Sequence, residues 1–180
     1  DSRISLKDTQ IGNLTNRITF ISKAIQRLTK LQIIYFANSP FTYDNIAVDW
    51  EDANSDYAKQ YENEELSWSN LKDLTDVELY NCPNMTQLPD FLYDLPELQS
   101  LNIACNRGIS AAQLKADWTR LADDEDTGPK IQIFYMGYNN LEEFPASASL
   151  QKMVKLGLLD CVHNKVRHLE AFGTNVKLTD

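Results

Sequence analysis

One irregular spacing of apolar residues constrains the fold of this chain more than any other feature. In the stretch IQIFYMGYNNLEEFP, residues 131–145, apolar side chains fall at positions 1, 4, 6, 11 and 14, counting Ile131 as position 1, and Asn139 stands at position 9. An amphipathic helix repeats its apolar residues every 3.6 positions, and a half-buried strand alternates every second one. The stretch fits neither rule throughout, which indicates a short strand followed by a sharp turn.

The same spacing recurs along the chain. Five copies begin at Leu31, Leu74, Leu98, Ile131 and Leu156. A weaker sixth copy begins at Asp8 and keeps Ile11, Asn13, Asn16, Ile18 and Ile21. The starts are 23, 43, 24, 33 and 25 residues apart, so three spacings match one repeat unit and two carry insertions, at about 42–70 and 110–129.

The physical meaning of the pattern is that successive units stack. Positions 4 and 6 lie two residues apart on a strand, so their side chains point the same way, into the stack. No unit can bury its apolar side alone, and neighbouring units must cover it. An Asn at position 9 suits the turn, where its side chain pairs with backbone groups, and repeated copies should form a ladder of such residues.

Units such as LTDVELYNCPNMTQLPDFLYDLPELQSLNIACN resemble the leucine-rich-repeat family over most of the chain. The resemblance implies an α/β fold: a right-handed solenoid with a parallel β-sheet on its concave face and helices or 3-10 turns on its convex side. It also implies a single domain over residues 1–180 that recognises other proteins. The irregular units are most similar to those of bacterial cell-surface repeat proteins, which implies an exported, cell-surface location.

The first insertion is rich in aromatic residues. Asn54 or Ser55 could cap a helix through about Glu65, with Tyr57 and Tyr61 one turn apart. Trp50 and Trp68 flank this segment. The rings either form an arm for a partner or cover the flank of the solenoid, and covering the flank is the favoured interpretation.

The second insertion predicts an amphipathic helix. Ser110 and Gln113 have the spacing of a capping box. Helical spacing of apolar residues follows, at Ala111, Leu114, Trp118 and Leu121. The acidic run at 123–126 and the Gly-Pro pair at 128–129 should end the helix in a solvated loop.

Composition argues against several classes of partner. The net charge of −9 disfavours a nucleic-acid backbone, which is bound by clustered Lys and Arg. The chain has no apolar run of about 18 residues that could insert into a membrane. It begins without Met or an apolar signal region, and it ends where a seventh copy would start. We therefore expect a fragment of a longer chain.

Motifs for chemistry are weak, and we expect no enzyme, metal site or cofactor. Asp52, Asn54 and Asp56 imitate the start of a calcium loop, but Tyr57 stands where the loop needs Gly and Asn63 where it needs Glu.

Two further pairings could support catalysis. Cys161 and His163 could pair as nucleophile and base, although Cys161 occupies an inward position where a thiol is inert. Asp160 with His163 is the least implausible catalytic pair. The three cysteines are expected to be free thiols.

A partner should bind the concave face, where positions 3, 5, 7 and 8 point. The predicted partner-binding residues are Tyr35, Asn38, Asp76, Glu78, Tyr80, Asn102, Tyr135, Tyr138, Asp160 and His163. Tyrosines combine apolar area with a hydrogen-bonding tip, and the carboxylates favour a partner with basic character. The first hypothesis is a protein or peptide ligand. The alternative is a glycan stacked on the tyrosines.

Overall fold

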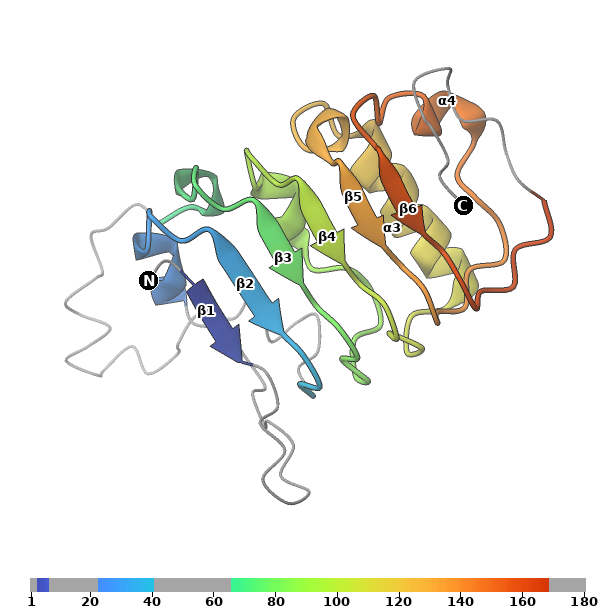
Figure 1. Cartoon of the computed structure of the whole chain (residues 1–180), viewed down its shortest axis with the longest axis horizontal. Helices are drawn as coiled ribbons and strands as arrows, with labels where there is room; N and C mark the ends of the chain where they lie inside the picture. The colour runs from blue at the N-terminus through green and yellow to red at the C-terminus, as the bar shows by residue number, and fades with distance from the viewer. Residues whose placement is uncertain (1–2, 7–22, 41–65, 169–180) are drawn as a thin grey trace.

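The strands of the repeats form one parallel sheet. The computed structural model describes residues 3–6, 23–40 and 66–168. Within these residues six strands lie side by side in chain order (Figure 1): β1 (Arg3–Leu6), β2 (Ile33–Phe36), β3 (Asp76–Glu78), β4 (Ser100–Asn102), β5 (Ile133–Tyr135) and β6 (Leu158–Asp160). Each strand is parallel to the next, as the resemblance to leucine-rich repeats implies.

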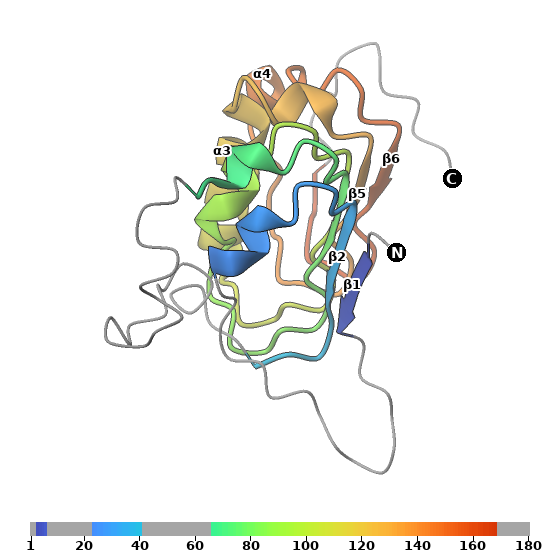
Figure 2. The same cartoon turned by 90° about the vertical axis from the view of Figure 1, so that its left-hand side faces the viewer.

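Short helices cover only one side of this sheet, as Figure 2 shows. They are η1 (Lys23–Arg27), η2 (Trp68–Asn70), η3 (Asp90–Asp94), α3 (Ala111–Asp123), η4 (Gly128–Lys130) and α4 (Ser147–Leu150). Most are single 3-10 turns, because a repeat of about two dozen residues leaves little chain for the return path. The molecule is therefore an open solenoid with a sheet on one side and helices on the other.

The strands align in the register that the repeat spacing predicts. Position 4 of each repeat lies beside position 4 of the next, in the order Ile34, Val77, Leu101, Phe134 and Leu159. The first four of these side chains are at most 2% exposed, and Leu159 packs against the same cluster. The prediction that positions 4 and 6 point into a common core is confirmed.

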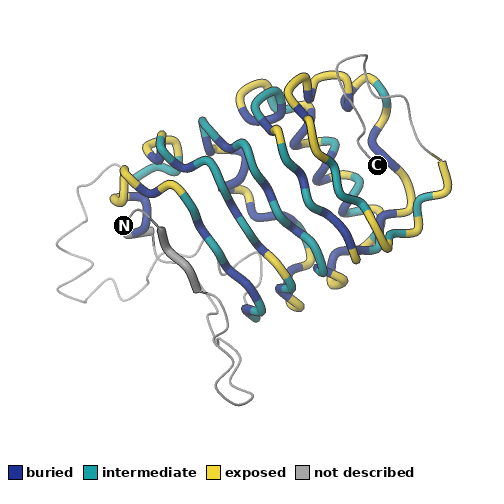
Figure 3. The backbone as a smooth tube through the Cα atoms, in the orientation of Figure 1, coloured by how far each residue is buried: buried dark blue, intermediate teal, exposed yellow. Residues whose placement is uncertain are grey.

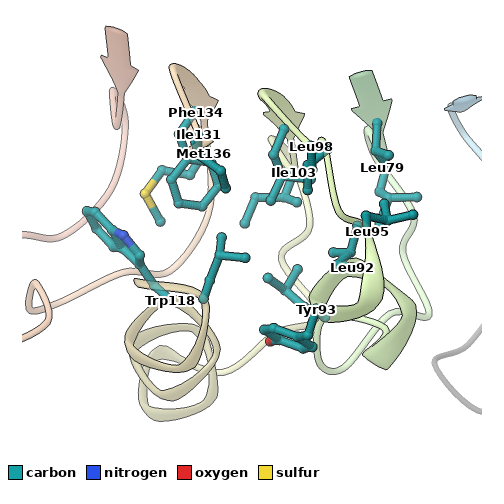
Figure 4. Packing of buried hydrophobic residues seen from close by; sticks show 14 of the residues in the cluster. Leu79, Leu92, Tyr93, Leu95, Leu98, Ile103, Trp118, Ile131, Phe134 and Met136 are labelled. Atoms are coloured by element: carbon teal, nitrogen blue, oxygen red, sulfur yellow. The ribbon is translucent and has the colours of Figure 1, made fainter. Parts of the chain in front are cut away.

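The core runs continuously between the sheet and the helices (Figure 4). Leu98, Ile103, Ile131 and Met136 are all 0% exposed, and Leu95 of the returning chain packs among them. The last coil is covered less well, and Figure 3 shows long exposed stretches there. Leu158 is 36% and Val162 51% exposed, since no described strand lies beyond β6.

The first strand lies elsewhere than the sequence predicted. A repeat beginning at Asp8 would have placed Ile11 and Asn13 in the strand, but Arg3–Leu6 is the segment that pairs with β2. Its Ile4 aligns with Ile34. Residues 7–22, which include the rest of the expected copy, lie outside the described residues.

The Asn ladder at position 9 joins neighbouring coils through hydrogen bonds. Asn106 accepts from the backbone N–H of Cys82 (2.7 Å) and donates to the carbonyls of Leu79 (2.7 Å) and Ile103 (2.8 Å). Asn139 repeats this pattern one coil on, where its Oδ1 accepts from the N–H of Asn106 at 2.6 Å. These buried amides satisfy backbone groups that the sheet does not reach.

Cys82 replaces the amide in its own coil. Its Sγ lies 3.5 Å from the carbonyl oxygen of Phe36, and burial raises the pKa of the thiol to about 12. The thiol is 0% exposed, so it acts as a small buried residue with a weak donor. All three cysteines are free, as predicted.

Of the first insertion, Trp68 lies within the described residues. Its ring stacks on Phe91 with centroids 4.3 Å apart, and it packs against the core. This arrangement agrees with an aromatic residue that covers the flank of the solenoid. The expected helix around Tyr57 and Tyr61, and Trp50, fall outside the described residues.

The second insertion forms the predicted helix α3. The Ser110 hydroxyl accepts from the N–H of Gln113 at 3.2 Å, which is one half of a capping box. The Gln113 side chain instead donates to Asp117 (2.7 Å), whose other oxygen accepts from the N–H of Leu88 (2.8 Å). Burial raises the pKa of Asp117, and its hydrogen bond with Leu88 ties α3 to the preceding repeat.

Candidate functional site

The side of the sheet that faces away from the core is free of described helices. We call it the open face, formed by positions 3 and 5 on β2–β6 and by positions 7 and 8 in the turns that follow. The position 5 residues stand in register in one row: Tyr35, Glu78, Asn102, Tyr135 and Asp160. All ten predicted partner-binding residues lie on this face and none is buried. Their role in binding stays a prediction.

Tyrosines and carboxylates dominate the open face. Tyr80 is 36% and Tyr138 41% exposed, which makes them two of the most exposed large apolar side chains described. From position 2 to position 8, the five described repeats contain Asp76, Glu78 and Asp160 but no Lys or Arg. The face therefore presents negative charge beside aromatic surface.

Position 8 has a left-handed backbone in all five of these repeats. The φ angles are 53° at Asn38, 50° at Asn81, 65° at Cys105, 58° at Tyr138 and 52° at His163. Asn and His are several-fold enriched in this conformation, which otherwise costs a residue with a Cβ about 1–2 kcal/mol. Three repeats thus carry a residue type that favours it, and Cys105 and Tyr138 are the less suitable ones.

Position 8 of the last two coils holds two aromatic rings in contact. Tyr138 and His163 occupy position 8 of adjacent coils, and their rings stack with centroids 4.3 Å apart and planes 26° from parallel. At the other end of the row the amide of Asn81 donates to Asn38 at 2.6 Å. The rim of the open face is therefore polar in the early repeats and aromatic in the late ones.

Two position 5 side chains are held by their own backbone. Asn102 accepts from the N–H of Ala104 (2.9 Å), and Asp160 accepts from the N–H of Val162 (3.0 Å). These contacts fix the direction of each side chain on the face. In the turn after β3, a side-chain hydrogen bond with Cys105 raises the pKa of Tyr80.

The surroundings of Cys161 and His163 do not favour the nucleophile–base pair considered from the sequence. Burial, followed by the negative charge of Asp160, raises the pKa of the Cys161 thiol and disfavours the reactive thiolate. His163 stacks on Tyr138. Among residues 3–6, 23–40 and 66–168, no group of three His, Cys, Asp or Glu side chains is placed to hold a metal ion.

Hollows occur elsewhere, beside the last coil. One of about 500 Å³ is lined by Lys115, Glu142, Glu143, Phe144, Pro145, Ala146, Ser147 and His168. The ammonium of Lys115 and the carboxylate of Glu143 form an ion pair at 2.5 Å on its wall. Two of its charged groups, Lys115 and Glu143, thus already pair with each other.

No helix in the described part of the chain is both long and apolar enough to cross a membrane.

The chain is similar to a leucine-rich repeat protein of Bacteroides eggerthii of known crystal structure, with 61% sequence identity and a TM-score of 0.86. The match covers 98% of this chain and 28% of that protein. Toll-like receptor 7 of Drosophila melanogaster is 31% identical over 105 residues, which are 57% of this chain and 7% of the receptor. No protein-family model matches the sequence. The chain thus spans less than a third of the length of each of these relatives.

Sequence reasoning missed the left-handed backbone at position 8 and the stacked rings built on it. Asn38, Asn81 and His163 carried the available signal, because Asn and His are several-fold enriched at positive φ. Cys105 and Tyr138 gave none. Their conformation follows from the shared geometry of the repeat and not from their own preference.

Proposed function

Because this chain is a leucine-rich-repeat protein, we propose that it is a non-enzymatic recognition module that binds a protein or peptide partner on its open face. One observation carries the proposal. Five strands in register bring tyrosines and carboxylates from four of the five repeats, together with Asn102 of the β4 repeat, into adjacent rows on a surface that no described helix covers. Interface anchors are often tyrosines, since they supply apolar area together with a hydrogen bond.

The size of the face suits an extended segment of a partner. Parallel strands lie about 4.8 Å apart, so β2 to β6 span roughly 19 Å. An extended peptide rises about 3.3 Å per residue, and roughly six residues would cross the face. The relation to a receptor, Toll-like receptor 7, supports recognition as the general activity.

The proposal is tested by selecting peptides from a random library against the whole chain. The selected peptides are then titrated against Glu78→Lys, Tyr135→Ala and Asp160→Lys by fluorescence anisotropy. We expect each variant to weaken binding by about fivefold or more, the size of a typical anchor contribution of about 1 kcal/mol. Melting temperatures should change by only a few degrees, because none of the three side chains is buried.

Glu125→Lys is the matched control, since it reverses an exposed charge in the loop after α3, away from the open face. It should bind the selected peptides as the wild type does. Unaltered affinity in all three open-face variants would place the site elsewhere. If the chain binds glycans on an array and selects no peptide from the library, the alternative of a sugar-binding open face would replace the proposal.

We also propose an exported, cell-surface location. The resemblance to bacterial surface repeat proteins and the Bacteroides relative support it. Labelling intact cells of the source organism with a membrane-impermeant amine reagent tests this, because an exported protein is labelled before lysis and an internal one only after it.

A further inference from the structure

One carboxylate of the open face, that of Asp160, lies against the neighbouring repeat at Gly137. A Cβ atom placed on Gly137 would come within 3.3 Å of Asp160 Oδ1, so this oxygen sits directly over Gly137. Tyr135 precedes Gly137 by two residues and pairs in register with Asp160. Tyr138 follows Gly137 and is 41% exposed. The carboxylate therefore lies over a backbone segment that carries a tyrosine on either side of Gly137.

Gly137 is what allows this arrangement. An added Cβ would also lie 3.1 Å from Val162 Cγ2, which is tighter than an ordinary contact. A larger residue would push the Asp160 and Val162 side chains away from the strand. The other repeats carry Ala37, Tyr80, Ala104 and Val162 at this position, so the close approach is specific to the β5 repeat.

The negative charge of Asp160 is not matched by a basic side chain on the open face. The ion pairs seen among the described residues lie in the helices and loops, as between Arg120 and Asp90 or between Lys152 and Asp123. Asp160 Oδ1 accepts one backbone hydrogen bond, from Val162. A carboxylate has room for several more donors.

The strained tyrosine of this segment also suggests a role outside stability. Tyr138, whose ring stacks on His163, adopts a left-handed backbone at φ 58°, where Asn would serve with less strain. Strained residues often persist where they contact a ligand. Aromatic faces attract cations, and an arginine guanidinium can stack on a ring while donating two hydrogen bonds to a carboxylate.

We propose that Asp160, together with Tyr135 and Tyr138 of the neighbouring repeat, receives a basic side chain of the protein partner, and that arginine fits it better than lysine. The inference rests on the proposed function and gives the partner a stated chemistry. The occupant is a segment of a partner protein with an exposed Arg or Lys. The negative open face supplies the charge complementarity.

The test uses two defined probes, a ten-residue peptide of alternating Gly and Arg and its Gly-Gln counterpart, titrated into the whole chain and followed by NMR. At low salt, we expect the Arg peptide to shift the amide signals of Gly137 and Val162. The Gln peptide should leave these signals unchanged. Asp160→Asn should weaken Arg-peptide binding about two- to fivefold, the range for an exposed ion pair. A matching Gly-Lys peptide should bind more weakly.

Tyr138→Asn provides a second variant that keeps the left-handed backbone. It should weaken the Arg peptide by about two- to fivefold, as loss of an exposed cation–π contact does. Its melting temperature should stay within a few degrees, because relief of strain offsets loss of the stacked ring. Glu125→Gln controls for net charge and should leave binding unchanged.

The inference fails if the Arg peptide does not bind, if Asp160→Asn binds it like the wild type, or if Glu125→Gln weakens it equally. These outcomes are separable from failure of the proposed function. One such outcome is that the library yields peptides without Arg or Lys that bind Tyr135→Ala more weakly than the wild type. That result would support the open face as a binding site and would reject a basic side chain as its occupant.

Discussion

Replacing Trp118 by alanine should remove about 3–5 kcal/mol from the free energy of unfolding, the range for truncating a large buried aromatic. Trp118 is 0% exposed and projects from α3 toward the β5 repeat (Figure 4). Its ring meets Phe134 edge-on with centroids 5.6 Å apart and meets Phe144 at 5.1 Å. Its indole N–H points at the sulfur of Met153, 3.3 Å away.

The size of the effect follows from how many elements this one ring joins. Alanine would leave a cavity between the inserted helix and two repeats, and that space can only partly collapse because the strands are fixed in register. Urea denaturation followed by circular dichroism measures the loss. Lys115→Ala, which removes a partly exposed ion pair between the same helix and Glu143, should cost no more than about 1 kcal/mol. A loss below about 1 kcal/mol for Trp118→Ala would mean that α3 is not docked on the repeats.

Replacing Asn106 by alanine should cost about 3 kcal/mol or more, although it deletes only a small side chain. The substitution leaves the N–H of Cys82 and the carbonyl of Leu79 without their side-chain partner, whereas the carbonyl of Ile103 keeps a hydrogen bond from Asn139. Each buried polar group left unpaired costs about 1–3 kcal/mol. Asn106 is 0% exposed, so water cannot take its place without opening the stack.

Asn164 is the matched control for this prediction. It holds the same place in the last coil, where it accepts from the N–H of Leu141 (2.9 Å) and donates to the carbonyl of Met136 (2.9 Å). Asn164 is only half-buried, so water can replace its bonds in Asn164→Ala. We expect this variant to lose clearly less stability than Asn106→Ala under the same denaturation. Equal losses of unfolding free energy in the two variants would show that burial does not strengthen the hydrogen bonds of the Asn ladder.

The strands of the central repeats could be predicted because their inward positions are buried and must therefore carry apolar residues. Leu101 and Phe134 stand at the same position of successive repeats and must both point into the stack, and they do. The first rung was misplaced because Ile11 and Asn13 lie two residues apart, just as Ile4 and Leu6 do. Local spacing cannot separate these two candidates, and pairing with β2 decides between them.

The candidate site was predictable only in outline. The alternation of side chains along a strand placed Tyr135 and Asp160 on the open face without knowledge of the structure. It could not show that Asp160 lies over Gly137, or that Tyr138 stacks on His163, because both contacts cross between coils. The same limit applies to Gln113, whose expected partner in its own helix cap was displaced by a bond to Asp117.

The most direct measurement of the central claim is a disulfide scan of neighbouring coils. Ser100 and Ile133 face each other in register on β4 and β5, where Cα atoms of adjacent strands lie about 4.8 Å apart, within the reach of a disulfide. Ser100→Cys with Ile133→Cys should therefore oxidise to an intramolecular bond, mapped by mass spectrometry. Ser100→Cys with Tyr135→Cys, offset by two residues and about 8 Å apart, should not. Preferential cross-linking of the offset pair, or none in either, would contradict a stack of repeats in this register.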